Sequence, residues 1–204
     1  MPSSRHVIIG AGFAGAAAAY HLAKGGADRI IVIEQEEVPG VHSSGRNASM
    51  VRQIVPDPAI AVLAHEGATF LQDLPPDWSE PVSYKSNGSL LLARGKELEG
   101  LMEDVQRAQQ MGTPAECWSR KEAEKRVEIL KGTDFEGAVW CPTDGVVDIH
   151  ALLTAYLKGA TSLGTEIRYG SPVKQIEVEG DRITRLRAGN DWITADVVIN
   201  AAGA

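Results

Sequence analysis

The sequence predicts an α/β fold in which a parallel βαβ unit opens the chain, a mixed α+β segment interrupts it, and a late strand returns to the first sheet. Three observations support this prediction. An apolar run, a glycine turn and an alanine-rich stretch follow one another at residues 5–24, a β-branched run covers 29–34, and a similar run covers 196–201. A helix between two strands is the usual connection of parallel neighbours.

Each element of the opening unit has its own signal. Residues 5–9 form a short apolar strand, residues 13–24 a helix, and Gly25 and Gly26 are suited to end that helix. Residues 29–34 are a continuous β-branched run, typical of a strand that is covered on both faces. Residues 36–49 then form a polar loop whose length is usual for functional or mobile loops.

Capping and turn residues define the elements of the middle segment. Asp57 and Pro58 begin a helix that ends before Pro75. Asn87-Gly88 predicts a hairpin between strands at 82–85 and 89–93. The further elements are a helix at 96–111 that carries an apolar stripe, a short helix opened by the capping box of Ser119 and Glu122, and an extended run at 138–141.

The last part of the chain begins with a helix and continues with strands. Asp148 caps a helix that runs to residue 163. Strand-like runs follow at 166–169, 173–178, 182–188 and 196–201. We therefore predict a nucleotide-binding domain in two parts, residues 1–50 and 146–204, interrupted by a segment of a second domain at 51–145.

Composition excludes several classes of function. The 204 residues are 44% hydrophobic, which suffices for a sizeable core, and their net charge of −7 argues against nucleic acid or an anionic membrane as partner. Two cysteines, Cys117 and Cys141, make neither a disulfide framework nor a zinc cluster. No apolar run approaches the ~18 residues of a membrane helix, and the first residues do not read as a signal peptide, so we expect a cytoplasmic protein.

The glycine turn has the pattern G-x-G-x-x-G. Gly10 permits the tight turn, Gly12 allows a diphosphate to approach the backbone, and Gly15 lets helix and strand pack closely, as in Rossmann-type dinucleotide sites. Glu34 ends the next strand, where a carboxylate accepts from a ribose hydroxyl and disfavours a 2′-phosphate. The alternative is a glycine-rich turn without a ligand.

Several segments together resemble the D-amino-acid oxidase-like family of FAD-dependent oxidoreductases, which includes glycine and sarcosine oxidases. The resemblance lies in 7–15 (VIIGAGFAG), 31–34 (IVIE), Pro39-Gly40, 43–48 (SSGRNA), 144–148 (DGVVD) and 196–204 (DVVINAAGA), and it follows the family's order along the whole chain.

The resemblance implies extended FAD, with its diphosphate at the glycine turn, a ribose on Glu34, adenine near Val173 and the flavin near the loop of residues 43–48. The short polar side chains of Ser43, Ser44 and Asn47 can donate to phosphate or flavin oxygens, and Arg46 can add a charge-assisted contact. Each assignment has an alternative without a cofactor. The loop at 43–48 could be an ordinary solvated turn, and residues 201–203 could be small only because sheet and helix pack tightly there. The implied cofactor-binding residues are Gly10, Gly12, Phe13, Ala14, Gly15, Glu34, Gln35, Ser43, Ser44, Arg46, Asn47, Ala48, Val173, Ala201, Ala202 and Gly203.

No catalytic or metal-binding residue stands out. Arg52 points either at the flavin and substrate or at solvent, and His42 has only its position in the loop to suggest flavin contact. Asp144 as a turn former and Asp148 as a helix cap need no ligand.

The resemblance implies oxidation of the C–N bond of a small amine or amino acid by hydride transfer to FAD. The alternatives are an FAD enzyme of the same fold acting on a hydroxy acid or polyol phosphate, and a non-catalytic NAD-binding module. Because members of the family continue well beyond the returning strand, we expect this chain to be an N-terminal portion that lacks a C-terminal half or partner chain, and that could be inactive alone.

Overall fold

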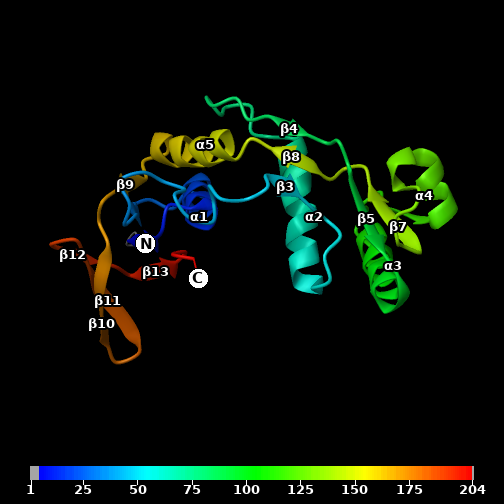
Figure 1. The fold of residues 1–204 in the computed structure, drawn as a ribbon. Coiled ribbons are helices and arrows are strands. Elements are labelled where there is room, and N and C mark those ends of the chain that lie inside the picture. The colour runs from blue at the N-terminus through cyan, green and yellow to red at the C-terminus, as the bar shows by residue number, and fades with distance from the viewer. Residues whose placement is uncertain (1–4, 204) are drawn as a thin grey trace. The chain divides into compact units, whose positions relative to one another are not determined.

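The structure, a computed structural model, describes residues 5–203 and groups the chain into two compact units (Figure 1). The first contains the chain up to Ala48, the segment Pro76–Val82 and the chain from Asp148. The second contains Ser49–Pro75 and Ser83–Val147. Each unit has its own sheets and its own buried core. Within residues 5–203, none of the helices combines the length and the apolar character needed to cross a bilayer.

A four-stranded parallel sheet is the centre of the first unit. Its strands, in spatial order, are β13 (Val197–Asn200), β1 (His6–Ile9), β2 (Ile30–Ile33) and β9 (Glu166–Arg168). Helix α1 (Phe13–Lys24) links β1 to β2, and α5 (Ile149–Ser162) precedes β9. The predicted parallel βαβ unit and the return of the last strand to β1 are therefore confirmed.

The last strand, predicted from the run at 196–201 that resembles the one at 29–34, is less buried than β2. β13 is an edge strand that pairs with β1 alone among the described strands, and Val197 is 40% exposed. Its apolar residues are half-buried or exposed, whereas β2 is buried along its whole length. A continuous β-branched run thus predicts a strand correctly in both β2 and β13. It predicts full burial correctly only for β2, which has a neighbouring strand on each side.

Small residues and a second sheet complete the layers of the first unit. Strands β10 (Val173–Glu179), β11 (Arg182–Ala188) and β12 (Asp191–Thr194) form an antiparallel meander. Leu186 and Ile193 of this meander pack with Val7, Ile31 and Ile33 of the parallel sheet. Helix α1 buries a face of alanines, which leaves room for close packing, and it contacts α5 as well as β1 and β2.

The segment Pro76–Val82 is fixed to the first unit by an aromatic cluster. Trp78 packs edge-to-face on Tyr20 of α1 and on Tyr156 of α5, with ring centroids 5.4 and 5.0 Å away. Lys158 Nζ lies 2.7 Å from Glu80 Oε2 in the same region. Burial, and secondarily Tyr20, raises the pKa of Tyr156 to about 12, so its hydroxyl stays neutral at physiological pH.

The second unit contains two small sheets and several helices. One sheet has the order β3-β8-β4 and the other β5-β7-β6. Its elements are β3 (Met50–Val51), α2 (Pro58–Gln72), β4 (Tyr84–Lys85), β5 (Ser89–Ala93), α3 (Gly95–Gln110), β6 (Glu116–Ser119), α4 (Arg120–Arg126), a 3-10 turn at Glu128–Leu130, β7 (Gly137–Cys141) and β8 (Gly145–Val147).

The predicted hairpin at Asn87-Gly88 is wrong. The chain does turn there, with Gly88 at φ +79, but β4 pairs with β8 while β5 pairs with β7. Gly88 lies against the ring of Trp140, where a Cβ would come within 2.0 Å, and its N–H donates to the Asp144 carbonyl. These contacts with distant residues direct the two strands into different sheets.

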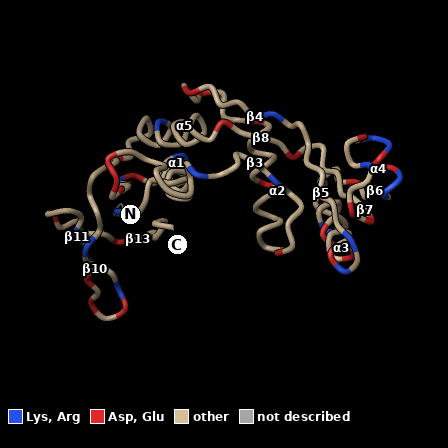
Figure 2. Tube along the Cα trace, in the orientation of Figure 1, with Lys and Arg blue, Asp and Glu red and all other residues tan. Residues whose placement is uncertain are grey.

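Helix caps follow the sequence signals. Asp57 accepts from two first-turn amides of α2, and Asp148 does the same for α5. Ser119 accepts from the Glu122 amide, which confirms the serine half of the capping box, while the Glu122 carboxylate accepts from Arg126 at 2.8 Å. Helix α4 carries charges of both signs (Figure 2), and exposed pairs of this kind add little stability.

Asp144 is more than the turn former that the sequence suggests, because its side chain is fully buried. Its carboxylate accepts from the backbone N–H and the side-chain Nε2 of Gln53, both at 3.0 Å, and from Ser89 Oγ at 2.6 Å. These bonds join the segment after β3, the start of β5 and the turn between β7 and β8. Burial raises the pKa of the neighbouring Cys141 thiol to about 11, so this thiol stays protonated at neutral pH.

Replacing Asp144 by alanine will destabilise the second unit by about 3 kcal/mol, since it leaves buried donors unsatisfied. Asp57→Ala, which removes an exposed cap of the same unit, will cost about 1 kcal/mol. Urea unfolding of both variants measures the difference. Equal losses would contradict the structural role assigned to the Asp144 network.

Candidate functional site

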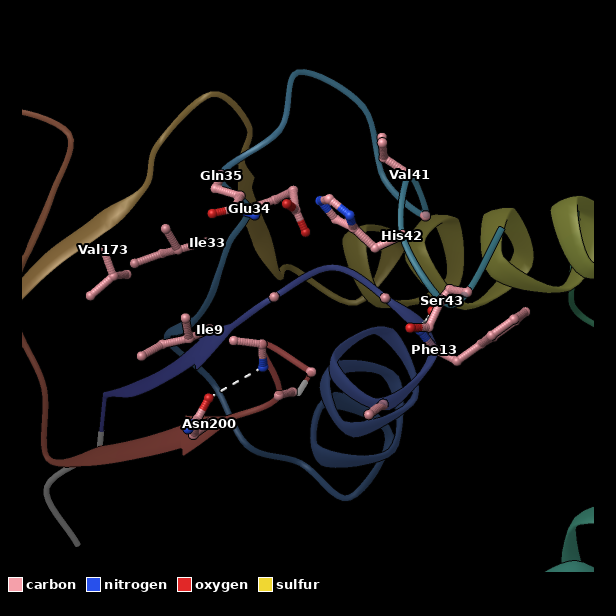
Figure 3. Close-up of a pocket in the computed structure, with 18 of the residues that line it drawn as sticks. Ile9, Phe13, Ile33, Glu34, Gln35, Val41, His42, Ser43, Val173 and Asn200 are labelled. Carbon is pink, nitrogen blue, oxygen red and sulfur yellow. Dashed lines mark hydrogen bonds between the residues drawn. The ribbon is translucent and has the colours of Figure 1, made fainter. Parts of the chain in front are cut away.

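A cavity of about 910 Å³ lies at the carboxyl ends of β1, β2 and β13, entirely within the first unit (Figure 3). Crevices at this edge are where open parallel sheets bind ligands. In Figure 3, Phe13 and Ser43 lie on the helix side of the cavity, and Val173 and Asn200 lie on the strand side. The cavity is therefore bounded by segments from both ends of the chain.

The three motif glycines lie in close contact with backbone or side-chain atoms. Gly10 has φ +104, and a Cβ there would lie 2.5 Å from the Ala201 carbonyl oxygen. A Cβ on Gly15 would lie 1.9 Å from the Gly10 carbonyl oxygen, and one on Gly12 would lie 2.8 Å from Ser44 Oγ. Gly10 thus allows the 201–203 segment to approach, Gly15 allows α1 to pack on the turn, and Gly12 leaves the helix entrance open.

The N-terminus of α1 is suited to an anion. Its N-cap residue is Gly12, which has no side chain, and the first turn contains no acidic residue. Ser44 from the 36–49 loop supplies the missing acceptor, because its Oγ accepts from the Phe13 N–H at 3.0 Å. First-turn amides lack partners within their own helix and carry the positive end of the helix dipole. This end of the cavity therefore favours a phosphate group.

Glu34 links the end of β2 to the glycine turn. Its side chain is buried, at 8% exposure; Oε2 accepts from the Ala11 N–H at 2.7 Å and Oε1 from the Glu36 N–H at 3.0 Å. Burial, and secondarily the charge of Glu34, raises the pKa of the nearby Tyr169 hydroxyl. The carboxylate is thus held in place by backbone donors from two sides.

The 36–49 loop is folded by its own hydrogen bonds. Gly45 N–H donates to the His42 carbonyl, and a Cβ on Gly45 would lie 2.2 Å from the Gly40 carbonyl oxygen. Asn47 Nδ2 donates to the carbonyls of Ser43 and Ser44 at 3.2 and 3.0 Å. His42 Nε2 lies 2.8 Å from the Glu36 carboxylate, so the start of the loop is joined to its middle.

Most residues that the sequence singles out do meet at this cavity. Those that line it are Gly10, Gly12, Phe13, Ala14, Glu34, Gln35, Ser43, Ser44, Arg46, Val173, Ala201, Ala202 and Gly203. Gly15, Asn47 and Ala48 are not among the lining residues. Gly15 is buried where α1 packs on the glycine turn, the Asn47 side chain donates to loop carbonyls, and Ala48 is exposed.

The residues implied by the sequence do not include six other lining residues, which are Ile9, Ile33, Gly40, Val41, Ser171 and Asn200. His42, for which only its position suggested flavin contact, also lines the cavity. Ile9, Ile33 and Asn200 end parallel strands, so the strand ends themselves were the available signal. Nothing in the local sequence marks Ser171, whose place depends on its N–H bond to the Glu34 carbonyl.

Comparison with known proteins gives consistent results. The family model described as FAD dependent oxidoreductase (DAO) matches residues 5–204. The chain is 28% identical to 4-methylaminobutanoate oxidase (formaldehyde-forming) of Paenarthrobacter nicotinovorans, over 98% of this chain and 24% of that protein. It is 24% identical to human mitochondrial sarcosine dehydrogenase, over 100% of this chain and 23% of that protein.

Solved structures share the fold. L-proline dehydrogenase from P. horikoshii superposes with a TM-score of 0.84 and 27% identity, over 99% of this chain and 53% of that one. Glycine oxidase from Geobacillus kaustophilus superposes with a TM-score of 0.80 and 22% identity, over 98% of this chain and 55% of that one.

The chain thus spans about a quarter of the length of these curated relatives and about half of these solved chains. The family match covers all of the residues that the structure describes, and it includes both ends of the chain that form the cavity. The chain therefore belongs to the DAO family of FAD-dependent oxidoreductases.

Proposed function

We propose that the protein containing this chain oxidises the C–N bond of a small amine or amino acid, with FAD bound in the cavity of the first unit. The observation that carries the proposal is the joint presence, at one cavity, of the buried Glu34 carboxylate and the start of α1, whose N-cap residue Gly12 has no side chain and whose first turn has no acidic residue. The names of several relatives, which refer to 4-methylaminobutanoate, sarcosine and L-proline, support an amine or amino acid as substrate.

The residues present fit the parts of FAD. The cavity of about 910 Å³ has the size of a cofactor site. Gly12 leaves space for the diphosphate, the first turn of α1 offers amide donors, and Arg46 on the cavity wall adds a positive charge. Glu34 accepts two backbone bonds, and a carboxylate has about four acceptor sites, so capacity remains for ribose hydroxyls.

The flavin, when bound, accepts the hydride that leaves the substrate carbon, and this chain supplies binding and orientation. The glycine turn and Ser44 hold the diphosphate end, while Val173 and Ile33 give the adenine end apolar surface. Ser43 and Arg46 line the same cavity from the 36–49 loop, and we assign them to the flavin side of the cofactor. The remaining predicted residues, Gly15, Asn47 and Ala48, have an indirect role in this proposal. Gly15 supports the glycine turn, Asn47 holds the backbone of Ser43 and Ser44, and Ala48 follows Asn47 in the loop.

A second candidate is oxidation of a hydroxy acid or polyol phosphate by the same fold. L-α-glycerophosphate oxidase from Mycoplasma pneumoniae, solved with FAD bound, shares the fold at a TM-score of 0.71 and 16% identity. The two candidates differ only in the bond that is oxidised, so substrate screening separates them.

The purified protein will be yellow, and anaerobic addition of a secondary amine or amino acid, such as sarcosine or L-proline, will bleach its flavin absorbance. Glycolate and glycerol 3-phosphate serve as matched hydroxy compounds and will leave the absorbance unchanged. Bleaching by a hydroxy compound alone would favour the second candidate, and a colourless protein that binds NAD would favour a non-catalytic module.

Gly12→Val will abolish FAD binding, because the branched side chain fills the helix entrance and collides with Ser44 Oγ, while the apo fold stays largely intact. Gly67→Val is the matched control: it places the same side chain in α2, where nothing lies within 4 Å of the added Cβ. FAD titration followed by flavin fluorescence measures both variants. Equal affinity in Gly12→Val and the control would refute the placement of the diphosphate.

A further inference from the structure

Asn200 occupies a special place in the parallel sheet. It is the last residue of β13 and lies opposite Ile9, the residue before Gly10. Its side chain lies at the cavity (Figure 3). A polar side chain at the carboxyl end of a strand, beside the glycine turn, can act either on the ligand or on the backbone that surrounds the ligand.

The Asn200 side chain holds the backbone that follows it. Asn200 Oδ1 accepts from the Ala202 N–H at 3.2 Å, which is the dashed bond in Figure 3. This two-residue spacing is that of an Asx turn, in which a short side chain takes the place of a backbone acceptor. The Ala201 N–H donates to the Ile9 carbonyl at 2.9 Å, so consecutive amides beyond β13 are both fixed.

The fixed segment forms one wall of the cavity. The Ala201 carbonyl oxygen would lie 2.5 Å from a Cβ on Gly10, so the two backbones meet with no side chain between them. Ala201, Ala202 and Gly203 all line the cavity, yet Ala202 and Gly203 are exposed. Within the described residues, the Asn200 side chain supplies a hydrogen bond that holds this wall at Ala202.

We propose that Asn200 is a positioning residue for the cofactor: its Asx turn holds the 201–203 backbone in the place where it contacts FAD. This role rests on the FAD site proposed above. It requires the amide oxygen of Asn200, because the oxygen is the acceptor, and it requires no contact between the Asn200 side chain and the cofactor.

The test compares Asn200→Ala, which removes the acceptor, with Asn200→Asp, which keeps it. In the apo protein, Asn200→Ala will lose hydrogen-exchange protection at the Ala202 amide, and Asn200→Asp will keep it. Asn200→Ala will also bind FAD about tenfold more weakly than the wild type, the effect of losing one hydrogen bond that orders a wall. Asn190→Ala, in the exposed β11–β12 turn, is the matched control and will change neither measurement.

Two results would overturn the role of Asn200 alone: equal Ala202 protection in wild type and Asn200→Ala, or equal FAD affinity in these two proteins. Failure of the wild type to bind FAD would overturn the proposed function, and the role of Asn200 with it. Because amide exchange is measured without cofactor, it reports on the turn separately from the FAD site.

Discussion

The first unit depends on the contact between the Gly10 backbone and the Ala201 carbonyl. This contact joins the turn after the first strand to the turn after the last described strand, and the positive φ of Gly10 together with its missing Cβ makes it possible. Any other residue would separate the two backbones or strain the turn. Since the cavity lies where these strands end, the same contact determines its shape.

The polar groups around the cavity are held by hydrogen bonds to other parts of this chain. Ser44 caps a helix that has no side-chain cap of its own, Glu34 is held by two backbone amides, and His42 contacts Glu36 within the 36–49 loop. Ordering these groups during folding lowers the entropy cost of ordering them on binding. This explains why a long polar loop lies folded beside the helix instead of extending into solvent.

Apart from the return of the last strand to β1, the features predicted from sequence are those whose determinants are local. The glycine turn, the strand after it and the caps at Asp57 and Asp148 are each specified within a few residues. The failed hairpin at Asn87-Gly88 depends on Trp140 and Asp144, which are distant in the chain. Likewise, the complete burial of Asp144 requires Gln53 and Ser89, and neither partner can be identified from the residues around it. The glycine motif and the family resemblance therefore named most of the residues that line the cavity, but not the contacts that close it.

The pairing of His6 with Val197 has a consequence for biosynthesis. The neighbour that covers one edge of β1 is synthesised almost two hundred residues after β1 itself. Contacts between such distant segments slow folding and leave strand edges open in the interval. The nascent chain must therefore carry an unpaired β1 edge until β13 has been synthesised, which is a stage at which chaperone protection would matter.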